Sequence, residues 1–421
     1  MKKFWMTFLT LILVFVMAAC SDHQSSSRAD QTRKEYNERI VLRFATWDSG
    51  EALKIQETIA KKFEEKHPFI KVQMEAYGDE FDQKLAAAIG AKNPPDVMYM
   101  WNYPAYFQSL EPLENFIKKD PTTDLNDFYQ GLFNYSTMYR KLYGMPAGFT
   151  TRVVYYNKDL FDAAGIPYPK DGWTWDDFKS VAKKLSNPTI EQYGFGIRPE
   201  PDTYDLQGIV WSNGSSFISE DGKKIDNYMN SPETIESIKM FADMVKEKSA
   251  VLVGGKNQQS GEEVFKAGKI AMWESGIWPL EEFKKAKVNF GTVEMPAFQG
   301  KPVRGVISSS AISIAKDSKN KDLAWEFVKF FSSPEAIQMR TADLPVRISM
   351  VKELKTDQDP LMGPFYKMLE RANATPAYLL TKNWDEINRN LSSAINAIML
   401  EQDAKELLNK SVLDSEKYMG Q

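Results

Sequence analysis

The sequence predicts an α/β fold built on a parallel sheet, and two features of residues 40–100 carry this prediction. Apolar, β-rich stretches alternate there with segments whose apolar residues recur at helical spacing, in the order strand, helix, strand, helix, strand. Each helix is also placed where it can carry the chain back to a parallel neighbour. We therefore expect a parallel sheet with right-handed crossovers and helices on its faces.

Each of these five elements has its own residue pattern. The first strand is predicted at residues 40–47 (IVLRFATW), and the helix at residues 51–66 places Ala52, Ile55, Ile59 and Phe63 on one face before His67-Pro68 ends it. Ile70, Val72, Met74 and Ala76 alternate along the second strand. The second helix carries Phe81, Leu85 and Ile89 and stops at Asn93-Pro94-Pro95, and residues 96–100 (DVMYM) form a short third strand.

The middle of the chain continues in the same style. Residues 152–157 (RVVYYN) predict a strand, and apolar faces mark one helix from Trp175 to Leu185 and another from Ile235 to Val245. Ser231-Pro232-Glu233 and Ser333-Pro334-Glu335 read as helix starts, with serine as the cap, proline in the first turn and glutamate at the positive helix end.

Composition excludes several classes of function. The 421 residues carry 53 Lys plus Arg and 57 Asp plus Glu, a formal net charge of −4, which argues against nucleic acid as a partner. One Cys and two His rule out a disulfide framework, a Cys/His zinc site and a Cys–His nucleophile pair. His23 and His67 are poor candidates for a serine triad. We expect neither a metal nor a cofactor.

The N-terminus predicts export and a lipid anchor. Met1-Lys2-Lys3 precedes sixteen uncharged residues (4–19), too few for a membrane-spanning helix and suited to a secretory signal. Met17-Ala18-Ala19-Cys20 resembles a lipoprotein signal, with Cys20 acylated as the first mature residue and residues 1–19 removed. The alternative is an ordinary cleaved signal with an incidental Cys20. The polar, Ser-rich residues 20–39 are predicted to be a flexible tether.

Four segments together resemble a known family, the extracellular carbohydrate-binding proteins of ATP-binding-cassette (ABC) importers, bacterial solute-binding protein family 1. They occur in the order expected for that family and, with the signal, span nearly the whole chain. They are residues 95–99 (PDVMY), residues 143–175 with YGMP, YNKDLF, AGI and WTW, residues 265–278 with FKAGKIAM, Gly276 and Trp278, and residues 324–335 with AWEFVKF and SPE.

The resemblance implies a two-lobed, periplasmic-binding-protein-like fold (type II) with a ligand cleft between the lobes. Lobe one would comprise residues 40–149 plus about 305–344, and lobe two residues 150–304 plus about 345–421. The family also implies a monomer, anchored by lipid in the cell membrane, that delivers its ligand to membrane permease subunits without chemical change. Independently, open α/β sheets bind ligands beyond the carboxyl ends of their strands, which points to the same cleft.

Tryptophans beside polar residues suggest a sugar as the ligand. A sugar ring stacks its C–H face on indole, while its hydroxyls need carboxylate, amide or guanidinium partners. Three pairs fit this pattern, and Asp79 adds a carboxylate in the turn after the second strand. The pairs are Trp47-Asp48, Trp101-Asn102 and Trp273-Glu274. Each single tryptophan has the alternative of packing under a loop.

Further cleft residues follow from the resemblance alone. The loop after Met145-Pro146 lines the cleft in the family, which nominates Thr150 and Arg152. Trp278 resembles the family's stacking tryptophan. The remaining candidates by similarity are Tyr204 in the segment 200–204, Ser308 and Arg347. For Arg152 and Arg347 the alternative is a surface ion pair, which contributes little.

Two other functions remain open from the sequence. A secreted, anchored glycosidase would need two carboxylates about 5–9 Å apart around one bond, a separation that sequence cannot measure. Its candidates are Asp48, Asp79, Glu200, Asp202, Asp205 and Glu274. The other is a two-lobed binder of a non-sugar solute such as a polyamine or a metal chelate. The acidic candidates would also suit a sugar that carries an amine.

Overall fold

A five-stranded mixed sheet forms one half of the molecule. The computed structural model describes residues 39–254 and 259–419, so the predicted signal, Cys20 and nearly all of the tether lie outside the described residues. Strands β1, β2 and β3 are parallel, as predicted, and β12 runs antiparallel between β3 and β6. The order is β2 (Ile70–Ala76), β1 (Ile40–Thr46), β3 (Val97–Met100), β12 (Ile307–Ile314) and β6 (Met145–Thr151).

Alternating residues of this sheet bury against helices on its two faces. On one face Phe44 of β1 contacts Phe327 of α12 (Lys321–Phe331) at 5.2 Å between ring centroids, and Phe63 of α2 (Gly50–Lys66) contacts the same ring at 5.0 Å. On the other face Ala45 packs with Leu85 of α3 (Phe81–Gly90). The sheet between helical layers confirms the predicted α/β class.

A second five-stranded sheet forms the other half. Strands β8, β9 and β10 are mutually parallel, and β7 runs antiparallel between β10 and β11. Helix α7 (Trp175–Leu185) begins with a capping box formed by Thr174. Helix α9 (Pro232–Lys246) is capped by Ser231, as predicted. The order is β11 (Phe290–Val293), β7 (Val153–Asn157), β10 (Ile270–Ser275), β8 (Tyr193–Ile197) and β9 (Ala250–Leu252).

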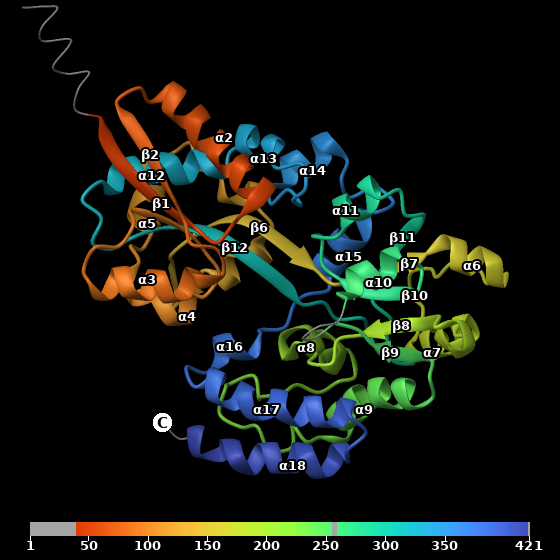
Figure 1. Cartoon of the computed structure of the whole chain (residues 1–421). Helices are drawn as coiled ribbons and strands as arrows, with labels where there is room; N and C mark the ends of the chain where they lie inside the picture. The colour runs from red at the N-terminus through yellow and green to blue at the C-terminus, as the bar shows by residue number, and fades with distance from the viewer. Residues whose placement is uncertain (1–38, 255–258, 420–421) are drawn as a thin grey trace, which may run out of the picture.

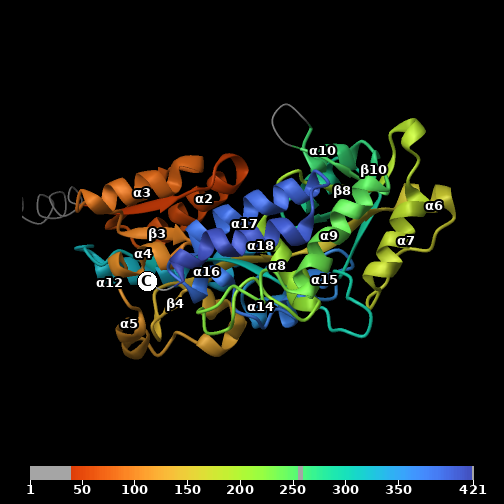
Figure 2. The same ribbon diagram turned by 90° about the horizontal axis from the view of Figure 1, so that it is seen from below.

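The first crossing between the two sheets consists of a single residue. Arg152 separates β6 of the first sheet from β7 of the second. The strand predicted at residues 152–157 therefore begins at Val153, one residue later than predicted, because the chain changes sheets at Arg152. The chain returns to the first sheet after β11, and α15 (Gly363–Glu370) contacts both β6 and β7. Helices α17 (Trp384–Met399) and α18 (Ala404–Ser415) then pack against α9, as Figures 1 and 2 show.

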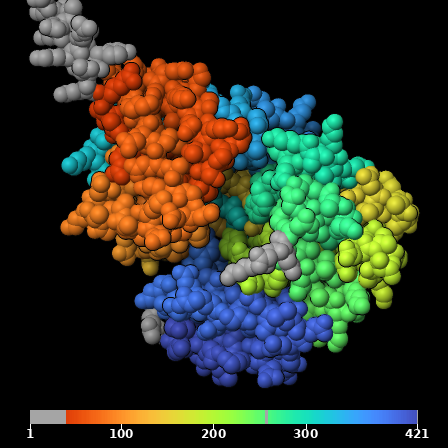
Figure 3. All heavy atoms as spheres, viewed as in Figure 1, coloured from red at the N-terminus to blue at the C-terminus, as the bar shows by residue number. Residues whose placement is uncertain are grey.

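A hollow lies between the two halves. In Figure 3 it opens between the orange N-terminal part, the green part of the second sheet and the blue C-terminal helices. Every described helix is too short or too polar to cross a bilayer. The remaining elements are α4 (Tyr103–Tyr106), α5 (Glu114–Lys119), β4 (Thr137–Met138), β5 (Lys141–Leu142), α6 (Lys158–Ala164), α8 (Thr203–Ser212), α10 (Gly261–Lys266), α11 (Leu280–Lys285), α13 (Pro334–Met339), α14 (Ile348–Leu354) and α16 (Ala377–Leu380).

Candidate ligand-binding cleft

Half of the predicted ligand-binding residues lie at the sheet edges where the parallel strands end. Because β1, β2 and β3 are parallel, the residues that follow them share one edge of the first sheet. In the second sheet β8 and β10 end side by side. The residues at these edges are Trp47 and Asp48 after β1, Asp79 after β2, Trp101 and Asn102 after β3, Arg198 after β8, and Glu274 and Trp278 at and after the end of β10.

Arg152, at the crossing between the sheets, organises a buried cluster of charges. Its Nη2 lies 2.5 Å from Asp205 Oδ1 and its Nε 3.4 Å from Glu274 Oε1, and the side chain is 9% exposed. Nη2 also donates to Ser308 Oγ at 3.3 Å. Within residues 39–254 and 259–419, Nη1 of this guanidinium has no hydrogen-bond partner. A buried cation is therefore held by two carboxylates, while both its Nη1 and its Nε lack a hydrogen-bond partner among the described residues.

The pKa of Glu274 depends on both its burial and the charges of its neighbours. Burial and the negative charge of Asp205 raise the pKa of Glu274 to about 7, while Arg152 and Arg198 act in the opposite direction. Arg198 pairs only loosely, with its nitrogens 3.8 Å from Asp205 and 3.7 Å from Glu262. The carboxyl of Glu274 is thus harder to ionise than that of an exposed glutamate.

Trp278 is the one tryptophan of the second half that presents a largely open ring. It is 49% exposed, and the Arg152 guanidinium carbon lies 4.8 Å from its ring centroid. Gly276 lies directly beneath it, since a Cβ added there would come within 2.3 Å of the indole. Glycine at position 276 lets the ring lie against the backbone beside the charged cluster.

Trp273 has a different position from the one expected. It is 2% exposed, its Nε1 donates to Glu262 Oε1 at 3.3 Å, and the Arg198 guanidinium carbon lies 5.3 Å from its ring centroid. The prediction paired Trp273 with Glu274 at a strand end, but both lie inside β10, where successive side chains point to opposite faces. Trp273 therefore presents no open face to the cleft.

Two predicted residues connect the halves of the molecule at the crossing. The backbone N–H of Ile277, after β10, donates to Thr150 Oγ1 of β6 at 2.9 Å. Tyr204 of α8 donates its hydroxyl to the backbone carbonyl of Ile307 at the start of β12. Burial raises the pKa of Tyr204 well above its usual value. The hydroxyl groups of Thr150 and Tyr204 are thus already engaged in holding the two sheets together.

The first half contributes an aromatic stack and a second acidic group. Trp47 stacks on Tyr99 with ring centroids 4.3 Å apart and 18° between the planes. Beside it, Asp48 accepts a hydrogen bond from Gln56. Burial, reinforced by the charge of Asp343 and opposed by Arg340, raises the pKa of Asp48 to about 6. These contacts place Asp48 near a carboxylate and an arginine that sequence reasoning had not named.

The other predicted residues of the first half separate into open and occupied side chains. Trp101 is 46% exposed, and Asp79 is exposed in a turn after β2. Asn102 accepts from the backbone N–H of Ala105 at 3.4 Å and so caps α4.

Arg347 is occupied within the first half. Its Nη1 donates to Asp127 Oδ2 at 3.0 Å, its Nε donates to the Ser332 carbonyl at 2.6 Å, and its guanidinium lies over the Phe128 ring at 4.3 Å. With these partners Arg347 stabilises the first half and does not point a free guanidinium into the cleft. Arg340, which is 6% exposed, is instead the arginine near Asp48.

The raised pKa of Asp48 predicts a pH-dependent stability. Because the folded protein holds the Asp48 proton more tightly than the unfolded chain, the contribution of Asp48 to stability is complete below its unfolded value near pH 4. That contribution falls as pH rises through about 6. At pH 8 we expect the free energy of unfolding of Asp48→Asn to exceed that of the unmodified protein by about 1–2 kcal/mol. At pH 4 the two proteins should be equal.

Urea unfolding at both pH values measures this effect. Asp79→Asn, which changes an exposed carboxylate at the same sheet edge, is the control and should leave both free energies unchanged. A stability gain of the same size at pH 4 would contradict the titration argument.

Comparison with known proteins identifies the family. The model of the family described as "Bacterial extracellular solute-binding protein" matches residues 47–338, more than half of the chain. The chain belongs to this family. The matched residues include Trp47, Arg152 and Trp278, so both edges of the cleft of this solute-binding protein fall within the match.

Similar proteins cover most of this solute-binding protein. The maltotriose-binding protein of Pyrococcus abyssi is 26% identical over 77% of this chain and 70% of its own length. The arabinooligosaccharide-binding protein of Bacillus subtilis is 24% identical over 98% of this chain and 94% of its own. The structure of an ABC substrate-binding protein from Listeria monocytogenes, solved in complex with cycloalternan, superposes with a TM-score of 0.81 at 24% identity. It covers 91% of this chain and 99% of the other, which confirms the two-lobed fold.

Proposed function

We propose that this solute-binding protein captures a sugar or oligosaccharide outside the cytoplasm and delivers it to the permease of an ABC importer. The observation that carries the proposal is the open Trp278 ring beside the buried Arg152 cluster. Support comes from relatives named for binding maltotriose and arabinooligosaccharides, and from a similar structure solved with cycloalternan.

The chemistry of the cleft suits a sugar. Trp278 offers an apolar ring face for the C–H face of a pyranose, and the spare Nη1 of Arg152 offers a donor to a hydroxyl. On the opposite edge Trp101 presents a second exposed aromatic ring, with Asp48 as an acceptor near Trp47. A sugar between these edges would make polar contacts with both halves, which favours closure of the halves around it.

Binding without chemical change is part of the proposal. A glycosidase needs one carboxyl on each side of the scissile bond. Asp205 and Glu274 both bind the same Arg152 guanidinium, which supports a role in neutralising a cation over one in flanking a scissile bond. The relatives are named as binding proteins, which favours the same conclusion.

A thermal-shift screen with mono-, di- and oligosaccharides tests the function. A true ligand at one hundred times its dissociation constant should stabilise the protein by about 2.7 kcal/mol, which is several degrees of melting temperature. Chromatography of the incubated sugar should show it unaltered. Release of shorter sugars would indicate a glycosidase, while a shift with polyamines and with no sugar would indicate the non-sugar binder.

We also propose that the protein is a lipid-anchored monomer, tethered through acylated Cys20 to the outside of the cell membrane. The uncharged run ending in Met17-Ala18-Ala19-Cys20 supports this, as does a family described as extracellular. The anchor would keep the captured sugar near its permease.

Replacing Cys20 by serine tests the anchor. We expect Cys20→Ser to appear in the medium or as an unprocessed precursor, because the acylated sulfur is lost, with ligand affinity unchanged. Cell fractionation with immunoblotting measures the distribution, and Ser21→Ala serves as the matched control. Normal processing and membrane retention of Cys20→Ser would mean that the signal is not a lipoprotein signal.

A further inference from the structure

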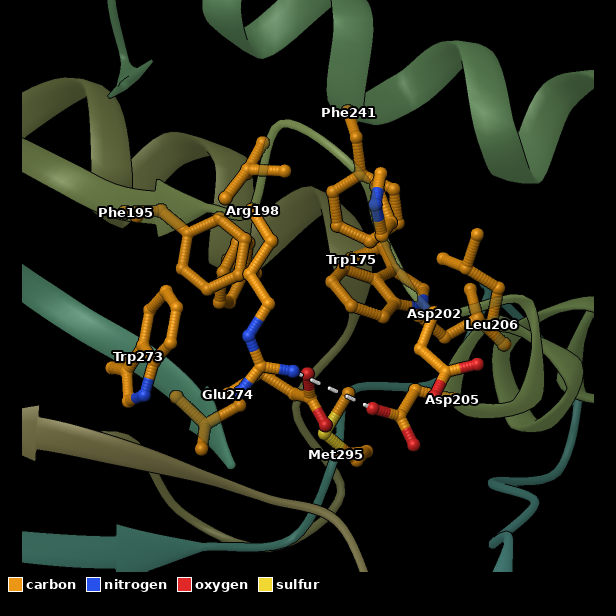
Figure 4. A pocket seen from close by; sticks show the side chains of 16 residues that line it. Trp175, Phe195, Arg198, Asp202, Asp205, Leu206, Phe241, Trp273, Glu274 and Met295 are labelled. Atoms are coloured by element: carbon orange, nitrogen blue, oxygen red, sulfur yellow. Dashed lines mark ion pairs between the residues drawn. The ribbon is translucent and has the colours of Figure 1, made fainter. Parts of the chain in front are cut away.

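A small cavity lies in the second half, next to the Arg152 cluster. Its volume is about 60 Å³. Figure 4 shows the rings of Trp175, Phe195 and Phe241 on one side of it, and the charged groups of Arg198, Asp202, Asp205 and Glu274 on the other. The cavity therefore has an apolar wall and a polar mouth, of which Asp202 is the most exposed member.

One buried donor on the wall is unsatisfied. Trp175 is 2% exposed, and among the described residues its indole Nε1 has no hydrogen-bond partner. A buried N–H that finds no acceptor is costly and rare in folded proteins. Nε1 has almost no accessible surface, so an occupant that brings an acceptor oxygen into the apolar part of the cavity would satisfy it after a shift of the indole toward the cavity.

The cavity adjoins the place where a sugar would stack. Asp205 and Glu274 line the cavity and also hold Arg152, whose guanidinium lies 4.8 Å from the Trp278 ring centroid. A substituent of a sugar ring on Trp278 can therefore point toward the mouth of the cavity. The carboxylates there are acceptors, so the part of the substituent near the mouth should carry a donor.

The size of the cavity limits the occupant. A cavity of roughly 150 Å³ holds benzene, with six heavy atoms, so about 60 Å³ suits a group of roughly three. An acetyl group has three heavy atoms, one of them a carbonyl oxygen. Water alone would leave the aromatic wall without apolar contacts, and a free amine would remain at the carboxylates and leave the cavity empty.

We propose that this cavity receives the acylamino group of an N-acetylated amino sugar, an inference that rests on the proposed sugar-binding function. The acetyl methyl packs against Phe195 and Phe241, and the indole of Trp175 shifts so that its Nε1 donates to the carbonyl oxygen. The amide N–H donates to a carboxylate at the mouth, Glu274 or Asp202. The ligand is thus distinguished by its substituent and not by its ring.

Calorimetry with matched sugars tests the proposal on the full mature chain. The probes are glucose, glucosamine and N-acetylglucosamine, the same three forms of galactose, and the dimers cellobiose, chitobiosamine and diacetylchitobiose. Within each monosaccharide series only the substituent at C2 changes, and in the dimers the C2 substituent changes on both rings. We expect the N-acetylated member of at least one series to bind at least tenfold more tightly than its hydroxyl and amine counterparts.

Other results overturn one of the two claims separately. Equal or weaker binding of the N-acetylated sugars, while the plain or amine forms bind, overturns the acylamino subsite and leaves the sugar-binding function standing. If no sugar from these series or from the wider screen binds, the proposed function itself fails.

Two variants locate the preference in the cavity. Ile209→Phe adds bulk to the cavity wall, and Trp175→Phe removes the indole N–H while keeping an aromatic ring. In each, the ratio of the dissociation constants of the hydroxyl and N-acetylated sugars should fall from tenfold or more to about one. Ile235→Phe, on the outer surface of α9, is the matched control and should keep the original ratio. An unchanged ratio in a folded Trp175→Phe protein would overturn the assignment.

Discussion

Replacing Arg152 by methionine is expected to lower the free energy of unfolding by about 3–5 kcal/mol and to weaken ligand binding severely. Methionine retains most of the side-chain volume but leaves Asp205 and Glu274 buried without their cation, the situation in which removing one partner of a buried ion pair is most destabilising. Guanidinium unfolding measures the stability, and calorimetry with the best ligand from the screen measures the affinity.

The loss should also depend on pH. Without Arg152 the pKa of Glu274 should rise above its value of about 7, so that a neutral carboxyl replaces the unpaired charge in mildly acidic solution. The variant should therefore lose less stability at pH 5 than at pH 8. Arg389→Met breaks an exposed ion pair with Glu386 and should change stability by less than about 1 kcal/mol. An equal loss at both pH values would mean that packing, and not charge, gives Arg152 its importance.

Two tryptophans five residues apart should respond to alanine in opposite ways. Trp273→Ala removes a ring that is 2% exposed and should lower the free energy of unfolding by about 3–5 kcal/mol. Trp278→Ala removes a ring that is 49% exposed and should leave stability nearly unchanged. The same change should weaken sugar binding by about 1–3 kcal/mol, or roughly ten- to hundredfold in the dissociation constant.

Melting temperature and calorimetry on both variants test this contrast, and each tryptophan serves as the control for the other. If Trp278→Ala keeps its affinity but melts at a much lower temperature, Trp278 is a core residue and the stacking proposal fails. If Trp273→Ala melts at the temperature of the unmodified protein, the Trp273 ring does not stabilise the core of the second half.

The fold was largely predictable because its signals are local. The strand–helix alternation of residues 40–100 reports which side chains are buried, and a short-range pattern is enough to place β1, α2, β2, α3 and β3. The serine caps of α9 and α13 lie beside their own helices. The second sheet and the crossing at Arg152 depend on pairings between distant segments, so the two-lobed arrangement came from the family resemblance.

The site was predictable only in part for the same reason. Strand ends pointed to Trp47 and Trp101, and resemblance to a family pointed to Trp278. Sequence reasoning missed Arg340 and Asp343 because nearly 300 residues separate them from Asp48, and nothing near either of them indicates that proximity. The prediction wrongly placed the Trp273 ring in the cleft together with Glu274. Because successive side chains of a strand point to opposite faces, two neighbours in β10 could not be expected to share one site.

If the halves close around a solute as proposed, the crossing at Arg152 lies near the axis of that movement. When two rigid bodies turn about a shared axis, an atom is displaced in proportion to its distance from that axis. Arg152, Thr150 and Ser308 lie where the two sheets meet, so their displacement would be small, whereas Asp79 follows β2, the strand of the first sheet farthest from β6, and would move further. A solute would therefore bind first to the nearly stationary groups around Arg152, and the residues farther from the crossing would contact it only on closure.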